Sequence, residues 1–126
     1  MRKKTYEVWF DKARDNLKWA KDNLRAGNYP LVCYLSQQAG ELAIKGLIYS
    51  RKVIPPKTHH LIRLAEVCKK NGISLEEIYP ILSRLSEYYF ESRYPDEANQ
   101  DLNHKRVAEK AFEDAKRAVE KIVKSL

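Results

Sequence analysis

Apolar residues recur at intervals of three and four positions through most of the 126-residue chain. The first such stripe consists of Tyr6, Trp9, Phe10, Ala13, Leu17, Ala20 and Leu24. This spacing places side chains on one face of an α-helix, whereas a half-buried β-strand alternates at every second residue. Glycine is scarce, with 4 in the chain, and no stretch alternates as a strand would. The pattern predicts an all-α fold.

Turn and capping residues divide the chain into five predicted helices. Their ranges are about 5–26, 30–52, 58–70, 74–92 and 105–124. Thr58 is the predicted cap of the third helix, and Ser74 with Glu77 forms a predicted capping box for the fourth. Short connections favour antiparallel neighbours. We therefore expect residues 1–126 to form a single domain, an up-and-down bundle of four to five helices.

Charge is unevenly distributed along the chain, which has 24 basic and 17 acidic residues and a net charge of +7. Residues 1–73 contain 15 basic and 6 acidic residues, residues 74–104 contain 2 and 7, and residues 105–126 contain 7 and 4. A basic field attracts nucleic acids and nucleotide phosphates. Lysine-rich helix faces that keep a small domain in solution give the same excess. Arg93 is one of only two basic residues in the acidic stretch.

Several classes of protein do not fit this sequence. No apolar run approaches the roughly 18 residues that span a bilayer, and no apolar segment follows the basic N-terminus as in a secretory signal. Cys33 and Cys68 are isolated, which predicts reduced thiols in a cytoplasmic protein. A zinc site needs about four clustered ligands, and the three histidines and two cysteines of this chain do not form such a cluster in the sequence. We expect no membrane, metal or cofactor.

Three stretches concentrate side chains that can bind a ligand. Residues 58–64 place two histidines at a predicted helix start, where they can cap the helix or face a ligand. Residues 88–96 combine three tyrosines, a phenylalanine and an arginine, groups that stack on bases and hold phosphates but also fill cores and pair with acids. Residues 34–46 place two glutamines, Glu41 and Lys45 on a largely apolar helix, where they line a groove or form a polar network.

In this order, these stretches resemble the HEPN family of small prokaryotic helical domains, over nearly the whole chain. The matching segments are residues 9–17, 26–30, 37–45, 56–64 and 93–96 and the alanine-rich last helix. The Tyr29-Pro30 helix opening, Thr58-His59-His60-Leu61 and Arg93-Tyr94-Pro95-Asp96 look like the branch often encoded beside a minimal nucleotidyltransferase. The resemblance implies a homodimer, a nucleotide or RNA ligand and a role like that of a toxin–antitoxin pair.

Many HEPN proteins are metal-independent ribonucleases that use an arginine followed, after four to six residues, by a histidine. Arg93 occupies the family's arginine position, but Ala98, Asn99 and Gln100 stand where the histidine would be, and ten residues separate Arg93 from His104. Asn99 can hydrogen-bond a phosphate or a base but cannot transfer a proton. The resemblance therefore implies a binding site near Arg93. Its expected residues are Arg93, Tyr94, Asp96, Asn99, His60 and Lys45.

Three functions remain open from the sequence. The first is a HEPN homodimer that binds nucleotide or RNA and works with a nucleotidyltransferase partner. The second is an active metal-independent ribonuclease toxin in which Arg93 and His104 are catalytic. The third is a structural adaptor without a ligand, which would use the small residues of the second helix for docking.

Overall fold

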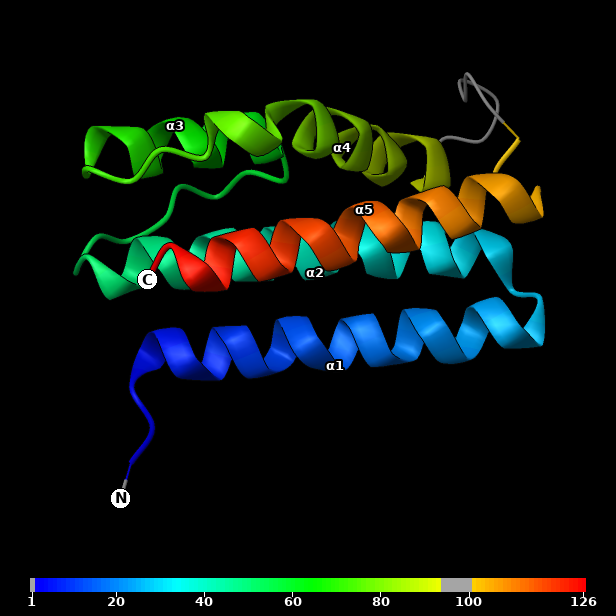
Figure 1. Ribbon diagram of the computed structural model, residues 1–126, viewed down its shortest axis with the longest axis horizontal. Helices are drawn as coiled ribbons and strands as arrows, with labels where there is room; N and C mark the ends of the chain where they lie inside the picture. The colour runs from blue at the N-terminus through cyan, green and yellow to red at the C-terminus, as the bar shows by residue number, and fades with distance from the viewer. Residues whose placement is uncertain (1, 94–100) are drawn as a thin grey trace.

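The computed structural model is all α-helical in the part of the chain that it describes, residues 2–93 and 101–126 (Figure 1), as the sequence predicts. The helices are α1 (Thr5–Ala26), α2 (Tyr29–Ser50), α3 (Leu61–Lys70), α4 (Tyr79–Arg93) and α5 (Lys105–Lys124), with a 3-10 turn at Glu76–Ile78. No helix in these two ranges combines the length and the apolar character needed to cross a bilayer.

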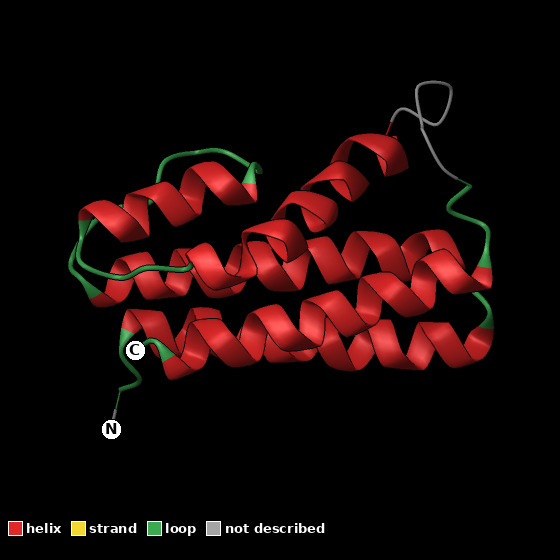
Figure 2. Ribbon diagram, turned by 45° about the horizontal axis from the view of Figure 1, so that its top comes forward, coloured by secondary structure: helices red, strands yellow, loops and turns green. Residues whose placement is uncertain are grey.

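Helix α2 lies at the centre of the bundle and contacts each of the other four α-helices. In both views, α3 and α4 lie on the side of α2 opposite α1 (Figures 1 and 2). Small residues at Ala39, Gly40, Ala43 and Gly46 are all buried on α2. These positions let neighbouring helices approach closely, which is why an almost uniformly buried helix fits between four others.

Helix α3 begins three residues later than the sequence predicts. Thr58 accepts a hydrogen bond from the backbone N–H of His60 (3.2 Å) but does not cap the helix, which starts at Leu61. The buried N–H of Leu61 donates instead to the hydroxyl of Ser86 on α4 (2.9 Å). A hydroxyl from another helix therefore performs the role that local spacing assigned to Thr58.

The predicted capping box at the start of the fourth helix is also wrong in detail. The Ser74 hydroxyl accepts from the N–H of Glu76 (3.4 Å), and a 3-10 turn precedes α4. The carboxylate of Glu77 pairs with Lys121 of α5 (2.9 Å). The Glu77 side chain therefore forms an ion pair with another helix and does not turn back toward Ser74, as a capping box requires.

Helix α5 has the predicted narrow apolar seam. Ala108, Ala111, Ala115, Ala118 and Ile122 are all fully buried. One acidic residue, Asp114, lies on the same face and is 1% exposed. The imidazole Nδ1 of His104 accepts from the N–H of Arg106 (3.2 Å) and caps the start of the helix.

Candidate functional site

The residues expected to bind a ligand are only partly within the described part of the chain. Arg93 is the last residue of α4, and its backbone alone is described. Tyr94, Asp96 and Asn99 lie outside the described residues, while Lys45, His60 and His104 lie within them. The described groups that surround the end of α4 therefore define the candidate site.

The buried carboxylate of Glu41 on α2 organises a polar cluster. Its Oε2 accepts from Nζ of Lys45 at 2.9 Å. Its Oε1 lies 3.0 Å from Nε2 of Gln37, which donates to it, and 2.9 Å from Nδ1 of His59. The Glu41 side chain is only 6% exposed, so these partners replace the water that would otherwise solvate it. We call Gln37, Gln38, Glu41, Lys45 and His59 the Glu41 cluster.

The two glutamines tie the segment before α3 to α2. Gln38 donates from Nε2 to Oε1 of Gln37 at 2.8 Å, and Gln37 donates to the backbone carbonyl of His59 at 3.3 Å. The prediction that these polar residues form a network is confirmed. Because both the carbonyl and the ring of His59 are held, the network fixes the position of its imidazole.

The imidazole of His59 also stacks on the ring of Tyr89 in α4. The ring centroids are 4.1 Å apart, and the planes differ by 14°. Tyr89 in turn meets Phe90 edge to face, with centroids 5.4 Å apart. Tyr89 precedes Arg93 by four residues, the spacing of neighbouring positions on one helix face. The Glu41 cluster therefore reaches the turn of α4 that leads to Arg93.

A shallow hollow lies on the exposed side of this region. It has a volume of about 210 Å³ and is lined by His60, Ser83, Ser86, Glu87 and Phe90. Phe90 is 52% exposed, although it is large and apolar. An exposed aromatic ring beside hydroxyl and imidazole groups can bind a flat heteroaromatic ligand through stacking and hydrogen bonds.

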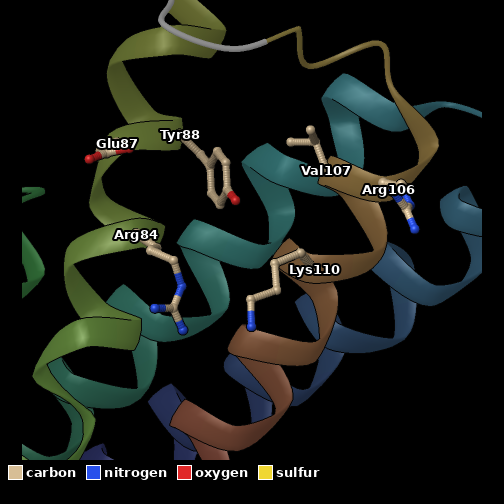
Figure 3. Close-up of a pocket in the computed structure, with 6 residues that line it drawn as sticks. All are labelled: Arg84, Glu87, Tyr88, Arg106, Val107 and Lys110. Atoms are coloured by element: carbon tan, nitrogen blue, oxygen red, sulfur yellow. The ribbon is translucent and has the colours of Figure 1, made fainter.

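A second hollow lies between α4 and α5, as Figure 3 shows. It has a volume of about 270 Å³ and is lined by Arg84, Glu87, Tyr88, Arg106, Val107 and Lys110. Arg84 of this lining donates two hydrogen bonds to the buried carboxylate of Asp114 (2.9 and 3.0 Å). Lys110 Nζ lies 3.5 Å from the same carboxylate. The second hollow is basic, but one buried acid already neutralises part of its charge.

A hydrogen bond and burial shift the pKa values of two groups in this hollow. The hydrogen bond to Asp114 raises the pKa of Arg84 above its ordinary value, so the guanidinium stays charged. Burial raises the pKa of the Tyr88 hydroxyl, which therefore stays protonated. Neither group is a proton donor or acceptor near neutral pH. Glu87 lines both hollows and places a negative charge between them.

The geometry of a metal centre is absent from the described part of the chain. No three carboxylate, imidazole or thiol groups converge there. Glu87 and Glu91, which are four residues apart, differ in environment because Glu87 is exposed and Glu91 is 6% exposed. Neither carboxylate oxygen of Glu91 has a hydrogen-bond partner among the described residues.

Sequence reasoning missed two residues of this region. His60 is the expected ligand-binding histidine and lines the first hollow, while its neighbour His59, which the sequence did not single out, is held by Glu41 and Tyr89. Spacing could not separate two adjacent histidines ahead of a helix. Asp114 was also missed, although an acidic residue within the alanine seam of α5 is a signal for a buried ion pair.

Comparisons with known proteins agree with this architecture. The crystal structure of TT1696 from Thermus thermophilus superposes with a TM-score of 0.86 at 26% sequence identity, covering 98% of this chain and 100% of that chain. The crystal structure of ST0689, described as an archaeal HEPN homologue, superposes with a TM-score of 0.76 at 26% identity, covering 98% of each chain. No curated protein gives a match. The model of the HEPN domain matches residues 6–126, and the chain therefore belongs to the HEPN family.

Proposed function

We propose that this chain is a single HEPN domain over residues 1–126 that forms a homodimer and binds nucleotide or RNA beside Arg93. In this proposal it works with a minimal nucleotidyltransferase in a system like a toxin–antitoxin pair. The observation that carries the binding site is the stack of His59 on Tyr89, four residues before Arg93. Beside it lies the hollow lined by His60 and the exposed ring of Phe90.

The aromatic, imidazole and hydroxyl groups of this region suit the base of a nucleotide. Bases stack on exposed aromatic rings, each such contact contributing roughly 1–3 kcal/mol, and guanidinium groups bind phosphate oxygens. Phe90 and His60 provide the ring faces, while Ser83 can hydrogen-bond a base edge or ribose. Lys45 is paired with Glu41 within the cluster, so we assign it a supporting position rather than direct contact.

The ribonuclease alternative that pairs Arg93 with His104 has less support. The Nδ1 of His104 accepts a hydrogen bond from the N–H of Arg106 and so caps α5. Use of His104 as a mobile proton-transfer group would disturb this cap, which typically contributes about 1 kcal/mol to helix stability. The adaptor alternative leaves the exposed Phe90 and the adjacent hollow without a role.

Exposed apolar side chains support the homodimer. Val8 and Trp19 of α1 are 53% and 43% exposed and lie eleven residues apart, the spacing of one helix face. A second copy of the chain that covers this face would remove both from water. Light scattering on the purified protein tests this, because a mass near 14.8 kDa at micromolar concentration would contradict the dimer.

Fluorescence anisotropy with a labelled single-stranded RNA and with free nucleotides tests the binding site. We expect Phe90→Ala and Arg93→Ala to weaken binding at least fivefold, and Lys116→Ala on the exposed face of α5 to leave it unchanged. Arg93→Ala should also reduce the salt dependence of RNA binding by roughly one phosphate contact. Equal binding by all three variants would place the ligand elsewhere.

The nucleotidyltransferase partner is tested separately. The chain and a minimal nucleotidyltransferase encoded beside it would be co-expressed, with an affinity tag on one protein only. Co-purification at a defined stoichiometry supports the pairing. Independent elution of two folded proteins would remove the partner from the proposal while leaving the ligand site intact.

A further inference from the structure

The shallow hollow on α4 places a hydroxyl, a carboxylate and an exposed aromatic ring next to one another. These groups belong to Ser86, Glu87 and Phe90. We propose that the hollow binds the guanine base of a nucleotide or of single-stranded RNA, and that Glu87 determines the selectivity for guanine. This inference rests on the proposed function and narrows it to one base. Every residue of the hollow lies within the described part of the chain.

One face of α4 builds most of the hollow. Ser83, Glu87 and Phe90 are separated by four and three residues, so their side chains follow one another along the helix. Ser86 lies beside them, and His60 borders the hollow from the segment before α3. The volume of about 210 Å³ is below the roughly 300–1,000 Å³ of pockets for drug-sized ligands. The hollow therefore suits a single base.

The hydroxyl of Ser86 provides a hydrogen-bond donor that is fixed in position. Ser86 is 5% exposed and accepts from the backbone N–H of Leu61 at 2.9 Å. The hydroxyls of Ser50 and Ser125 donate to backbone carbonyls three and four residues earlier. The hydroxyl of Ser86, by contrast, donates to no acceptor in residues 2–93 and 101–126. Its proton is therefore available to an acceptor on a ligand in the hollow.

The carboxylate of Glu87 provides two hydrogen-bond acceptors. Glu87 is exposed and forms no hydrogen bond or ion pair with another described residue. Arg84, three residues earlier, instead donates two hydrogen bonds to Asp114. Figure 3 shows that Glu87 points away from Arg84 and Lys110. Because a carboxylate accepts hydrogen bonds and donates none, it favours a ligand edge with two adjacent donors.

Guanine is the base whose Watson–Crick edge matches these groups. The edge presents the O6 acceptor, then the N1–H donor, then the N2 amino group. O6 can accept from Ser86, while N1–H and the N2 amino group can donate to the two oxygens of Glu87. The same edge of each other base has one donor group, which is the amino group of adenine or cytosine or the N3–H of uracil. One carboxylate oxygen would then have no partner on the base.

Phe90 and Glu87 contribute differently to binding. Phe90 is 52% exposed, and stacking on an aromatic ring strengthens the binding of any base because every base has a π-face. The selectivity must therefore come from the hydrogen-bonding groups. The negative charge of Glu87 also repels a phosphate, so the base and not the phosphate occupies the hollow.

Isothermal titration calorimetry with the full chain and GMP, IMP, AMP, CMP or UMP tests the selectivity. We expect GMP to bind roughly tenfold or more tightly than AMP, CMP and UMP, a difference of about 1.4 kcal/mol. IMP has the guanine edge without the N2 amino group and should bind roughly fivefold more weakly than GMP. Anisotropy with a single-stranded oligouridylate that contains one guanosine or one inosine makes the same comparison within RNA.

Glu87→Gln assigns the selectivity to its residue. The substitution replaces one acceptor oxygen by a donor, so we expect GMP to bind roughly fivefold more weakly while the affinity for AMP changes less than about twofold. Glu113→Gln is the matched control, because it makes the same change of charge at an exposed position of α5 and should alter neither affinity. Circular dichroism of both variants checks that the helices are intact.

The outcomes separate this inference from the proposed function. Equal affinity for all the bases, preference for another base, or an unchanged preference for guanine in Glu87→Gln would overturn the guanine assignment and leave nucleotide binding standing. Selectivity seen only with free nucleotides or only within RNA supports the assignment and identifies the source of the base. Failure to bind any nucleotide or RNA would overturn both.

Discussion

A Cβ atom on Gly46 of α2 would lie 2.9 Å from two ring carbons of Phe10 in α1. The Cβ atom of Trp9 would be 3.0 Å away. Phe10 is 3% exposed and packs in the core, so its ring cannot swing into solvent to make room. The two helices therefore meet through the bare backbone of α2 at this point.

Gly46→Ala should lower the free energy of unfolding by about 1–2 kcal/mol. Overpacking costs roughly 1–3 kcal/mol, and the better helix propensity of alanine offsets up to about 1 kcal/mol of that. The matched control is Gly40→Ala, where the new Cβ would lie 3.3 and 3.4 Å from terminal carbons of Leu61 and Leu85, which can adjust. Urea titration of both variants measures the difference, and equal midpoints would refute this account of the close approach.

Ser86→Ala should destabilise the protein by about 1–2 kcal/mol. It removes the acceptor of the Leu61 N–H and leaves that donor buried without a partner at the start of α3. Ser83→Ala, on the same helix but exposed, removes a hydroxyl with no such role and should change stability little. Thermal melts of the two variants, followed by circular dichroism, give the comparison. A larger loss for Ser83→Ala would contradict the capping role of Ser86.

Asp114→Asn should lower the free energy of unfolding by about 1–3 kcal/mol. The substitution retains the shape of the side chain but leaves the Arg84 guanidinium without its charged partner, and hydrogen bonds to charged groups contribute roughly that amount. Arg84 is 42% exposed, so water compensates part of the loss. Asp11→Asn is the control, because its ion pairs with Lys3 and Arg14 are exposed, and its urea midpoint should not move.

Stability should fall as the pH rises above about 9. Burial raises the pKa of Cys33 to about 12 and that of Cys68 to about 11, so both thiols keep their protons in the folded state after the unfolded chain has lost them. Because the folded state then binds more protons, each thiol contributes a decline of up to about 1.4 kcal/mol per pH unit. Calorimetry from about pH 8 to 11 measures it, and replacement of both cysteines by alanine should flatten the decline.

Periodic burial explains why the five helices were predictable, whereas the starts of α3 and α4 were not. The buried faces of α1 and α5 consist of apolar residues that recur every three or four positions, so the sequence spacing alone predicts these helices. The start of α3 depends on a hydroxyl of α4, 25 residues away along the chain. Similarly, the carboxylate of Glu77 pairs with α5 rather than completing a local cap. Contacts between distant segments therefore overrode local capping signals.

The candidate site likewise combines predictable and unpredictable contacts. The polar network around Glu41 was predictable, because glutamines and a glutamate on an apolar helix require partners. Which histidine joins this network was not predictable, because it depends on the path of the segment between α2 and α3. His59 and Tyr89, whose rings stack, are 30 positions apart in the sequence. The residue spacing in neither segment indicates this contact.

The central position of α2 has a consequence for how the protein unfolds. Every other α-helix packs against α2, so removing any one of them exposes part of a helix that is apolar on nearly all sides. The amides in the middle of α2 should exchange with deuterium only when the whole bundle opens, while those at the ends of α3 exchange through local fluctuations. Their exchange rates would then report the global free energy of unfolding directly, without added denaturant.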